Sequence, residues 1–112
     1  MLYADIATEE FNKLGIGHLI TVTCKDVCGK QYGIGGFDQG QHSVDAVFLD
    51  LPEPWLAIDH AKFILKPGRH ICCYSPCMEQ VMRTCDSLRG AGFHSVTMLE
   101  VLAFNAHIIH SA

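Results

Sequence analysis

The sequence predicts an α/β fold with an open, doubly wound sheet that ends in an antiparallel strand pair. From residue 45 to residue 91, short apolar strands alternate with amphipathic helices, which is the order that such a sheet requires. Two runs of alternating apolar residues then close the chain, at Ser95 to Val101 and at Ala103 to His110. No linker or repeat interrupts residues 1–112, so a single domain is expected.

The N-terminal part predicts a helix, a strand and a long irregular segment. The spacing of apolar residues favours a helix over Tyr3 to Leu14, and Gly15 with Gly17 is expected to end it. β-Branched residues predict a strand at Leu19 to Thr23. The segment Cys24 to Val44 is rich in glycine, and its Gly33-Ile34-Gly35-Gly36 run leads into no helix. We therefore interpret that run as a loop and not as a cofactor-binding motif.

The run Asp45 to Trp55 is the most informative part of the chain. Four apolar residues, Ala46 to Leu49, lie between two acids, and prolines break the chain after Asp50. This pattern predicts a strand that is buried on both faces and ends in a carboxylate. Open α/β sheets bind ligands at the carboxyl ends of their strands. Asp50 is therefore expected to act in chemistry, and the alternative is a structural role as a helix N-cap.

The remaining elements follow from periodicity and from turn residues. A helix is expected at Leu56 to Leu65, a turn at Lys66-Pro67-Gly68, a strand at His70 to Tyr74 and a helix at Met78 to Ala91. That last helix has an apolar stripe, expected to be buried, and an opposite polar face. The stripe is Met78, Val81, Met82, Cys85 and Leu88, and the polar face is Glu79, Gln80, Arg83, Thr84, Asp86 and Arg89.

Composition excludes several classes of protein. Among the 112 residues, 49% are hydrophobic and 18% are charged, which favours a packed fold over disorder. No apolar run reaches the roughly 20 residues that a membrane helix needs. The net charge of −4 is a poor match for a phosphate backbone. The six cysteines lie mostly in core-like positions, so reduced thiols of the nucleus or cytosol are expected. The spacing of Cys24 and Cys28 is not that of a zinc knuckle, and we predict no metal site.

Four segments form an ordered set with characteristic spacing: Thr23 to Cys28, Asp45 to Trp55, Leu65 to Gly68 and Tyr74 to Val81. Taken together, they resemble the tRNA adenine-N1 methyltransferase family, which methylates the T-loop adenine 58 of tRNA. The Ser-Pro-Cys-Met-Glu-Gln-Val form that begins at Ser75 most resembles the eukaryotic catalytic subunit. The resemblance runs from about Thr8 to Val101.

The resemblance implies a class I methyltransferase sheet, S-adenosylmethionine as cofactor and tRNA as substrate. It also implies a non-catalytic, RNA-binding partner subunit and a nuclear location, with the cytoplasm as the alternative. Asp26 and Val27 match the position that meets the adenine of the cofactor, where a carboxylate suits an exocyclic amine. Asp50 matches the reacting centre, next to both cofactor and substrate.

The same resemblance assigns a substrate pocket to Pro52, Glu53 and Trp55. The indole of Trp55 could stack on a base, and packing in the core is the alternative. Glu79 and Gln80 fit the family pattern, although they could serve only to begin a helix.

The chain also departs from the family. The Gly-rich loop after the first strand and the acid after the second are absent, so the sequence is expected to begin within the helix that follows the second strand. The implied strand order is 3-2-1-4-5-7-6, and loss of the first two strands would expose central edges. We therefore expect a truncated methyltransferase domain that is inactive alone. Two alternatives stay open: a non-catalytic interaction fragment that docks through its last strands, and a different small S-adenosylmethionine- or nucleotide-binding α/β protein.

Overall fold

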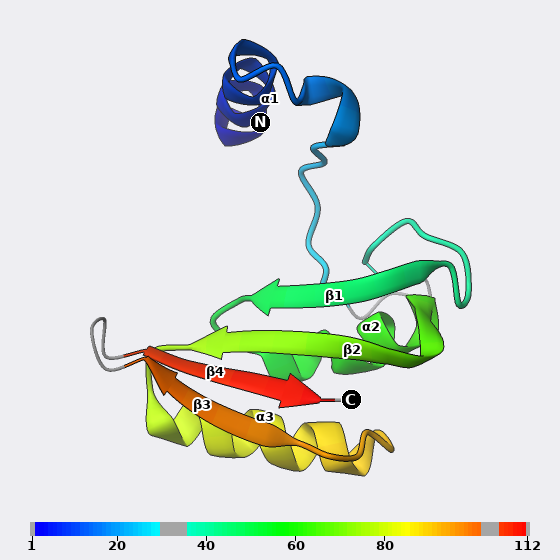
Figure 1. Cartoon of the computed structure of the whole chain (residues 1–112), viewed down its shortest axis with the longest axis vertical. Coiled ribbons are helices and arrows are strands. Elements are labelled where there is room, and N and C mark those ends of the chain that lie inside the picture. The colour runs from blue at the N-terminus through cyan, green and yellow to red at the C-terminus, as the bar shows by residue number, and fades with distance from the viewer. Residues whose placement is uncertain (1, 30–35, 102–105, 112) are drawn as a thin grey trace.

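The structure is a computed structural model that describes residues 2–29, 36–101 and 106–111. Four strands form one sheet in the order β1-β2-β4-β3 (Figure 1). Strands β1 (Val44–Asp50) and β2 (Leu65–Ser75) are parallel, whereas β4 (Ala106–Ser111) runs antiparallel to β2 and to β3 (Thr97–Val101). This is the 4-5-7-6 half of the expected sheet, and it confirms the predicted antiparallel pair at the end of the chain.

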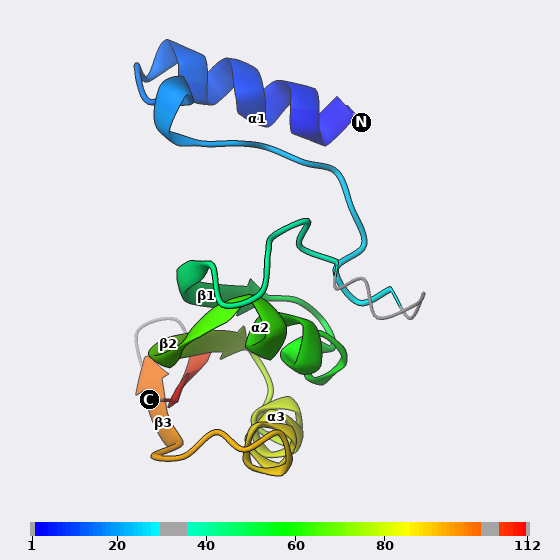
Figure 2. The ribbon, with the colours of Figure 1, turned by 90° about the vertical axis from the view of Figure 1, so that its right-hand side faces the viewer.

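Two helices cover one face of this sheet. Helix α2 (Ile58–Ile64) follows the short 3-10 helix η2 (Pro54–Leu56), and α3 (Met78–Gly90) follows β2. Figure 2 shows α2 and α3 on the same side of the strands. The core lies between them and the sheet, and its largest fully buried apolar side chains are Leu49, Ile58, Ile71, Val81 and Leu88.

The described residues leave the opposite face of the sheet uncovered, which corrects the expectation that β1 is buried on both faces. Val47 and Leu49 are buried beneath the helices, but Ala46 and Phe48 point the other way and are exposed, Phe48 by 62%. Successive side chains of a strand point to opposite faces. Since no helix of the described residues packs on that side, an apolar strand stays half exposed.

The buried stripe of α3 also differs from the prediction. It consists of Val81, Thr84, Cys85 and Leu88, whereas Met82 is 61% exposed. Thr84 was expected on the polar face. Its hydroxyl donates a hydrogen bond of 2.7 Å to the Gln80 carbonyl, so its polar atom is satisfied within the helix and the side chain can be buried.

The N-terminal helix is confirmed, but the predicted strand after it is wrong. Helix α1 (Leu2–Lys13) ends before Gly15, whose φ of +76° suits glycine. The 3-10 helix η1 (Gly17–Leu19) follows, and residues 20–26 form neither a helix nor a strand and pair with no strand of the described chain. A strand is stable only where a neighbour satisfies its backbone groups. Figures 1 and 2 show α1 apart from the sheet.

The described helices are too short or too polar to span a membrane.

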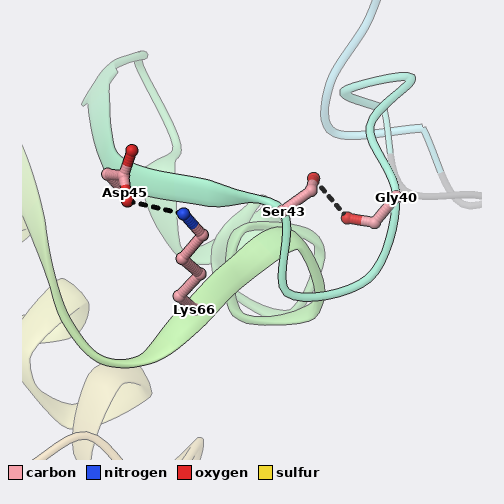
Figure 3. A network of polar contacts seen from close by, with 4 residues as sticks. All are labelled: Gly40, Ser43, Asp45 and Lys66. Atoms are coloured by element: carbon pink, nitrogen blue, oxygen red, sulfur yellow. Dashed lines mark hydrogen bonds and ion pairs between the residues drawn. The ribbon is translucent and has the colours of Figure 1, made fainter.

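The expected turn at Lys66-Pro67-Gly68 lies inside β2, where it forms a bulge of several residues. Val44 pairs with Leu65 and Ala46 pairs with His70, so four residues of β2 lie opposite Asp45 alone. Gly68 has a φ of +76°, a conformation that favours glycine. Across the bulge, Lys66 Nζ donates to Asp45 Oδ1 over 2.8 Å (Figure 3). Residues 66–69 therefore project from the amino end of the sheet.

Candidate functional site

Asp50 is the last residue of β1, at the carboxyl edge of the parallel strands. It pairs in register with Tyr74 near the end of β2, and its side chain is exposed. The N-cap position of η2 is Glu53 and that of α2 is Ala57, so Asp50 caps neither helix. The structural alternative for Asp50 is therefore wrong, and its carboxylate is available at the edge where such sheets bind ligands.

The loop after Asp50 is held by two polar residues of α3. Gln80 Nε2 donates a hydrogen bond of 3.0 Å to the carbonyl oxygen of Pro52. The guanidinium carbon of Arg83 lies 4.2 Å from the centroid of the Trp55 ring, a cation–π contact. The sequence predicted that Gln80 fits the family pattern or serves to begin the helix, and that Arg83 lies on the polar face of that helix. Their i, i+3 spacing, which places both side chains on one side of the helix, is the signal that could have indicated a shared role.

Trp55 is half-buried and packs against the core, which supports the core-packing interpretation over base stacking. Arg83 lies over one face of its ring. Pro52 and Glu53, the other expected pocket residues, are exposed. Of the three, Pro52 and Glu53 present atoms to solvent at this edge, and Trp55 anchors the loop that carries them.

Three buried polar atoms at this end of the molecule have no hydrogen-bond partner among the described residues. They are Trp55 Nε1, Gln80 Oε1 and the hydroxyl of Ser75 at the end of β2. A buried polar group without a partner costs about 1–3 kcal/mol, so it is normally paired with protein, water or ligand. One donor, one acceptor and one hydroxyl therefore stay buried and unpaired near the carboxyl edge in the described part of the chain.

Asp26 and Val27 lie in a tight turn that packs beside this loop. Asp26 Oδ1 accepts a hydrogen bond of 2.9 Å from the backbone N–H of Cys28, which orients the carboxylate. Val27 is half-buried against the core, and a Cβ added to Gly36 would lie only 2.1 Å from Val27 Cα. Only glycine allows that approach. The other glycines of the Gly33–Gly36 run lie outside the described residues.

The charges of Asp26 and Glu53 both act on the Cys28 thiol. Burial raises the pKa of the Cys28 thiol, and the charges of Asp26 and Glu53 raise it further. His60 Nε2 on α2 lies 3.0 Å from the carbonyl oxygen of Gly29, and this contact joins the turn to helix α2. No hydrogen bond or ion pair joins Asp50 to Asp26 in the described part of the chain.

The residues present fit part of an S-adenosylmethionine site. Asp26 offers an exposed, oriented carboxylate whose second oxygen has no partner among the described residues, and Val27 offers an aliphatic surface beside it. These groups suit an adenine ring with its exocyclic amine. No cluster of three metal-ligating side chains is found in residues 2–29, 36–101 and 106–111. Burial raises the pKa of Cys73 to about 12, so that thiol stays protonated in the core.

Comparison with known proteins decides the family. The family described as "tRNA methyltransferase complex GCD14 subunit" matches residues 2–110. This chain belongs to that family. A tRNA (adenine(58)-N(1))-methyltransferase catalytic subunit of Dictyostelium discoideum is 42% identical over 98 residues, which are 86% of this chain and 30% of that protein. The corresponding subunit of Schizosaccharomyces pombe is 37% identical over 101 residues, 85% of this chain and 26% of that protein.

Solved structures agree on the fold of this GCD14-family chain. An S-adenosylmethionine-dependent O-methyltransferase of Thermotoga maritima matches with a TM-score of 0.82 and 26% identity, covering 96% of this chain and 44% of that one. A tRNA (m1A58) methyltransferase of Aquifex aeolicus matches with a TM-score of 0.61 and 17% identity, covering 66% of this chain and 37% of that one. The fold is therefore part of a class I, Rossmann-like methyltransferase sheet, as predicted.

The chain spans about a quarter to a third of the length of the curated relatives that it matches. The resemblance to the tRNA adenine-N1 methyltransferases is thus confirmed for the region that the chain contains. A different small nucleotide-binding protein and a non-catalytic interaction fragment are not favoured by these matches. That residues 1–112 act as one domain stays a prediction.

Proposed function

We propose that this chain carries the reacting centre of a tRNA adenine-N1 methyltransferase, with Asp50 as its catalytic carboxylate and T-loop adenine 58 as its target. The observation that supports this most directly is the position of Asp50. It ends β1 at the carboxyl edge, its side chain is exposed, and it caps no helix. The loop that follows is held by Gln80 and Arg83.

The chemistry of adenine N1 explains why a carboxylate suffices. N1 already carries a lone pair, so its methylation needs little base catalysis, but it leaves the ring with a positive charge. A fixed carboxylate of Asp50 that accepts a hydrogen bond from the N6 amino group would stabilise that developing charge. The same bond would orient N1 for in-line attack.

S-adenosylmethionine supplies an electrophilic methyl group when bound, and Asp26, Val27 and Asp50 are the residues that we expect to hold it. The oriented carboxylate of Asp26 would accept from the exocyclic amine of its adenine, and Val27 would contact the ring. Asp50 would lie next to the reacting end. Pro52 and Glu53 would form the wall of the substrate pocket, and Trp55 would hold that wall in position from the core side.

A partner subunit is part of this proposal. The family is named for a tRNA methyltransferase complex, and the chain itself has a net charge of −4. An acidic surface attracts a phosphate backbone poorly, so a basic, RNA-binding partner would supply most of the affinity for tRNA. A nuclear location, expected from the resemblance, belongs to the same proposal.

A chimera tests the proposed function. The matched region of the Dictyostelium discoideum relative would be replaced by this chain, guided by the 98 aligned residues, and assayed with its partner subunit for methylation of unmodified tRNA. The chimera should be active. Asp50→Ala should lower kcat by at least about 100-fold, as loss of an electrostatic group does, while its affinity for S-adenosylhomocysteine stays within a few-fold.

Asp26→Asn is the matched comparison, because it removes a carboxylate charge at the cofactor position. It should weaken S-adenosylhomocysteine binding, measured by calorimetry, more than it lowers kcat at saturating cofactor. If Asp50→Ala kept wild-type turnover, the catalytic role would be wrong. If a folded chimera without substitutions were inactive on tRNA, the substrate assignment would be wrong.

A further inference from the structure

A cavity of this chain lies far from Asp50, at the opposite edge of the sheet. It has a volume of about 560 Å³, within the range of small-ligand sites. Its walls are the segment before β1, the exposed side of α2, the bulge of β2 and the loop after α3. Because β1 has seven residues, the two edges are separated by roughly 20 Å. The cavity therefore serves no step of the proposed methyl transfer.

Backbone hydrogen bonds build this cavity into the fold. The N–H groups of His42 and Ser43 donate to the carbonyl oxygens of Phe63 and Ile64 over 3.0 Å and 2.8 Å, which satisfies the last carbonyls of α2. The Ser43 hydroxyl in turn donates to the Gly40 carbonyl over 2.6 Å (Figure 3). The wall before β1 is thus joined to the helix end by regular hydrogen bonds.

Positive charge is concentrated around the cavity. Lys62, Lys66 and Arg69 line it, and Asp59 is the acidic residue in the lining, whereas the whole chain is acidic. Lys62 donates to the carbonyl oxygen of Ala91, and Lys66 pairs with Asp45. Arg69 is exposed and has no ion pair among the described residues. Its guanidinium is therefore available to an anion, and phosphate suits it well.

Aromatic rings complete the lining. Phe63 on α2 is 44% exposed beside the cavity, and Phe93 is half-buried after α3. In sites for single-stranded nucleic acids, bases stack on exposed aromatic rings while nearby positive charges bind the phosphates. An exposed ring next to an unpaired cation is therefore typical of such a site. Gly92, with a φ of +93°, leads the chain into this wall.

We propose that this cavity binds a nucleotide, with its base against Phe63 and Phe93 and its phosphate at Arg69. The same chemistry is offered by a free nucleotide and by one nucleotide of a single-stranded RNA. The volume, the available guanidinium and the exposed phenyl ring support the proposal independently of methyl transfer.

The test measures binding to the 112-residue chain, whose folding is checked first by circular dichroism. The probes are a labelled short oligouridylate and uridine 5′-monophosphate, since uridine avoids sites that select adenine. Arg69→Glu should weaken binding at least about tenfold. Phe63→Leu should weaken it roughly fivefold or more, through loss of stacking. Oligouridylate affinity should also fall as salt rises.

Each variant has a matched control elsewhere on the chain. Arg89→Glu reverses an exposed arginine on α3, and Phe48→Leu changes an exposed ring on the open face of the sheet. Both should leave affinity within about twofold. Binding of both probes indicates a site for free nucleotides, and binding of oligouridylate alone indicates an RNA contact. No saturable binding of either probe, or equal losses in cavity and control variants, would overturn the proposal.

Discussion

Gln80, in the first turn of α3, donates a hydrogen bond of 3.0 Å to the carbonyl oxygen of Pro52, two residues after Asp50. This bond joins the helix that follows β2 to the loop that follows β1. The loop after the candidate catalytic carboxylate is therefore positioned by a residue 28 positions away in the sequence.

Loss of this bond should loosen the loop. Gln80→Ala leaves the Pro52 carbonyl without its partner, and we expect the free energy of unfolding to fall by about 1 kcal/mol. Trp55 is the single tryptophan of the chain and lies in the same loop, so its emission should shift to longer wavelength. Urea unfolding followed by Trp55 fluorescence measures both effects. Glu79→Ala, at the exposed neighbouring position, should change neither.

Arg83 should shield the Trp55 ring from solvent. Its guanidinium lies 4.2 Å from the ring centroid, and such a contact contributes roughly 0.5–1 kcal/mol at an exposed site. Arg83→Met should therefore increase quenching of Trp55 by acrylamide, and Arg83→Lys should give a smaller increase. Arg89→Met, farther along α3, is the control and should have no effect. Unchanged quenching in Arg83→Met would show that the cation does not cover the ring in solution.

The two faces of the sheet should respond differently to loss of side chains. Ile71 is 1% exposed and lies under the helices, so Ile71→Ala should lower the free energy of unfolding by about 2–5 kcal/mol. Phe48 is 62% exposed on the open face, so Phe48→Ala should cost less than about 1 kcal/mol. Chemical denaturation measures both. Equal losses would mean that the open face is covered in solution, for example by a second copy of the chain.

The ion pair across the β2 bulge should give a defined pH dependence. The hydrogen bond and the charge of Lys66 hold the pKa of Asp45 below its usual value. A lowered pKa in the folded state stabilises the fold above the unfolded pKa, near 4, and this stabilisation is lost as pH falls through the folded value. The Tm difference between wild type and Asp45→Asn should therefore be largest near neutral pH and vanish in strong acid.

A double-mutant comparison isolates the pair. In a Lys66→Met,Arg69→Met background, which removes both cations that lower the pKa of Asp45, Asp45→Asn should change Tm equally at neutral and at acidic pH. A pH-dependent difference that survives there would assign the effect to another partner of Asp45.

Local pattern was sufficient for much of the fold. The apolar strand before Asp50, the helix from Met78 and the final antiparallel pair follow from periodicity and turn residues, which act over neighbouring positions. The position of Asp50 at the carboxyl edge followed from the same pattern together with the family resemblance. The contacts by which Gln80 and Arg83 hold the loop could not be predicted from the sequence, because their partners lie in a distant segment.

The failures share a physical cause. Residues 20–23 have the composition of a strand, but a strand needs a neighbour, and none of the described strands pairs with them. Phe48 and Met82 are apolar, but burial needs a covering element, and both stay exposed. The amino-acid order alone therefore decided which segments are helix or β-prone and where the carboxylates lie. Which strands pair, which faces are buried and how the Asp50 loop is held were decided by long-range packing, because these depend on groups that meet only in the folded chain.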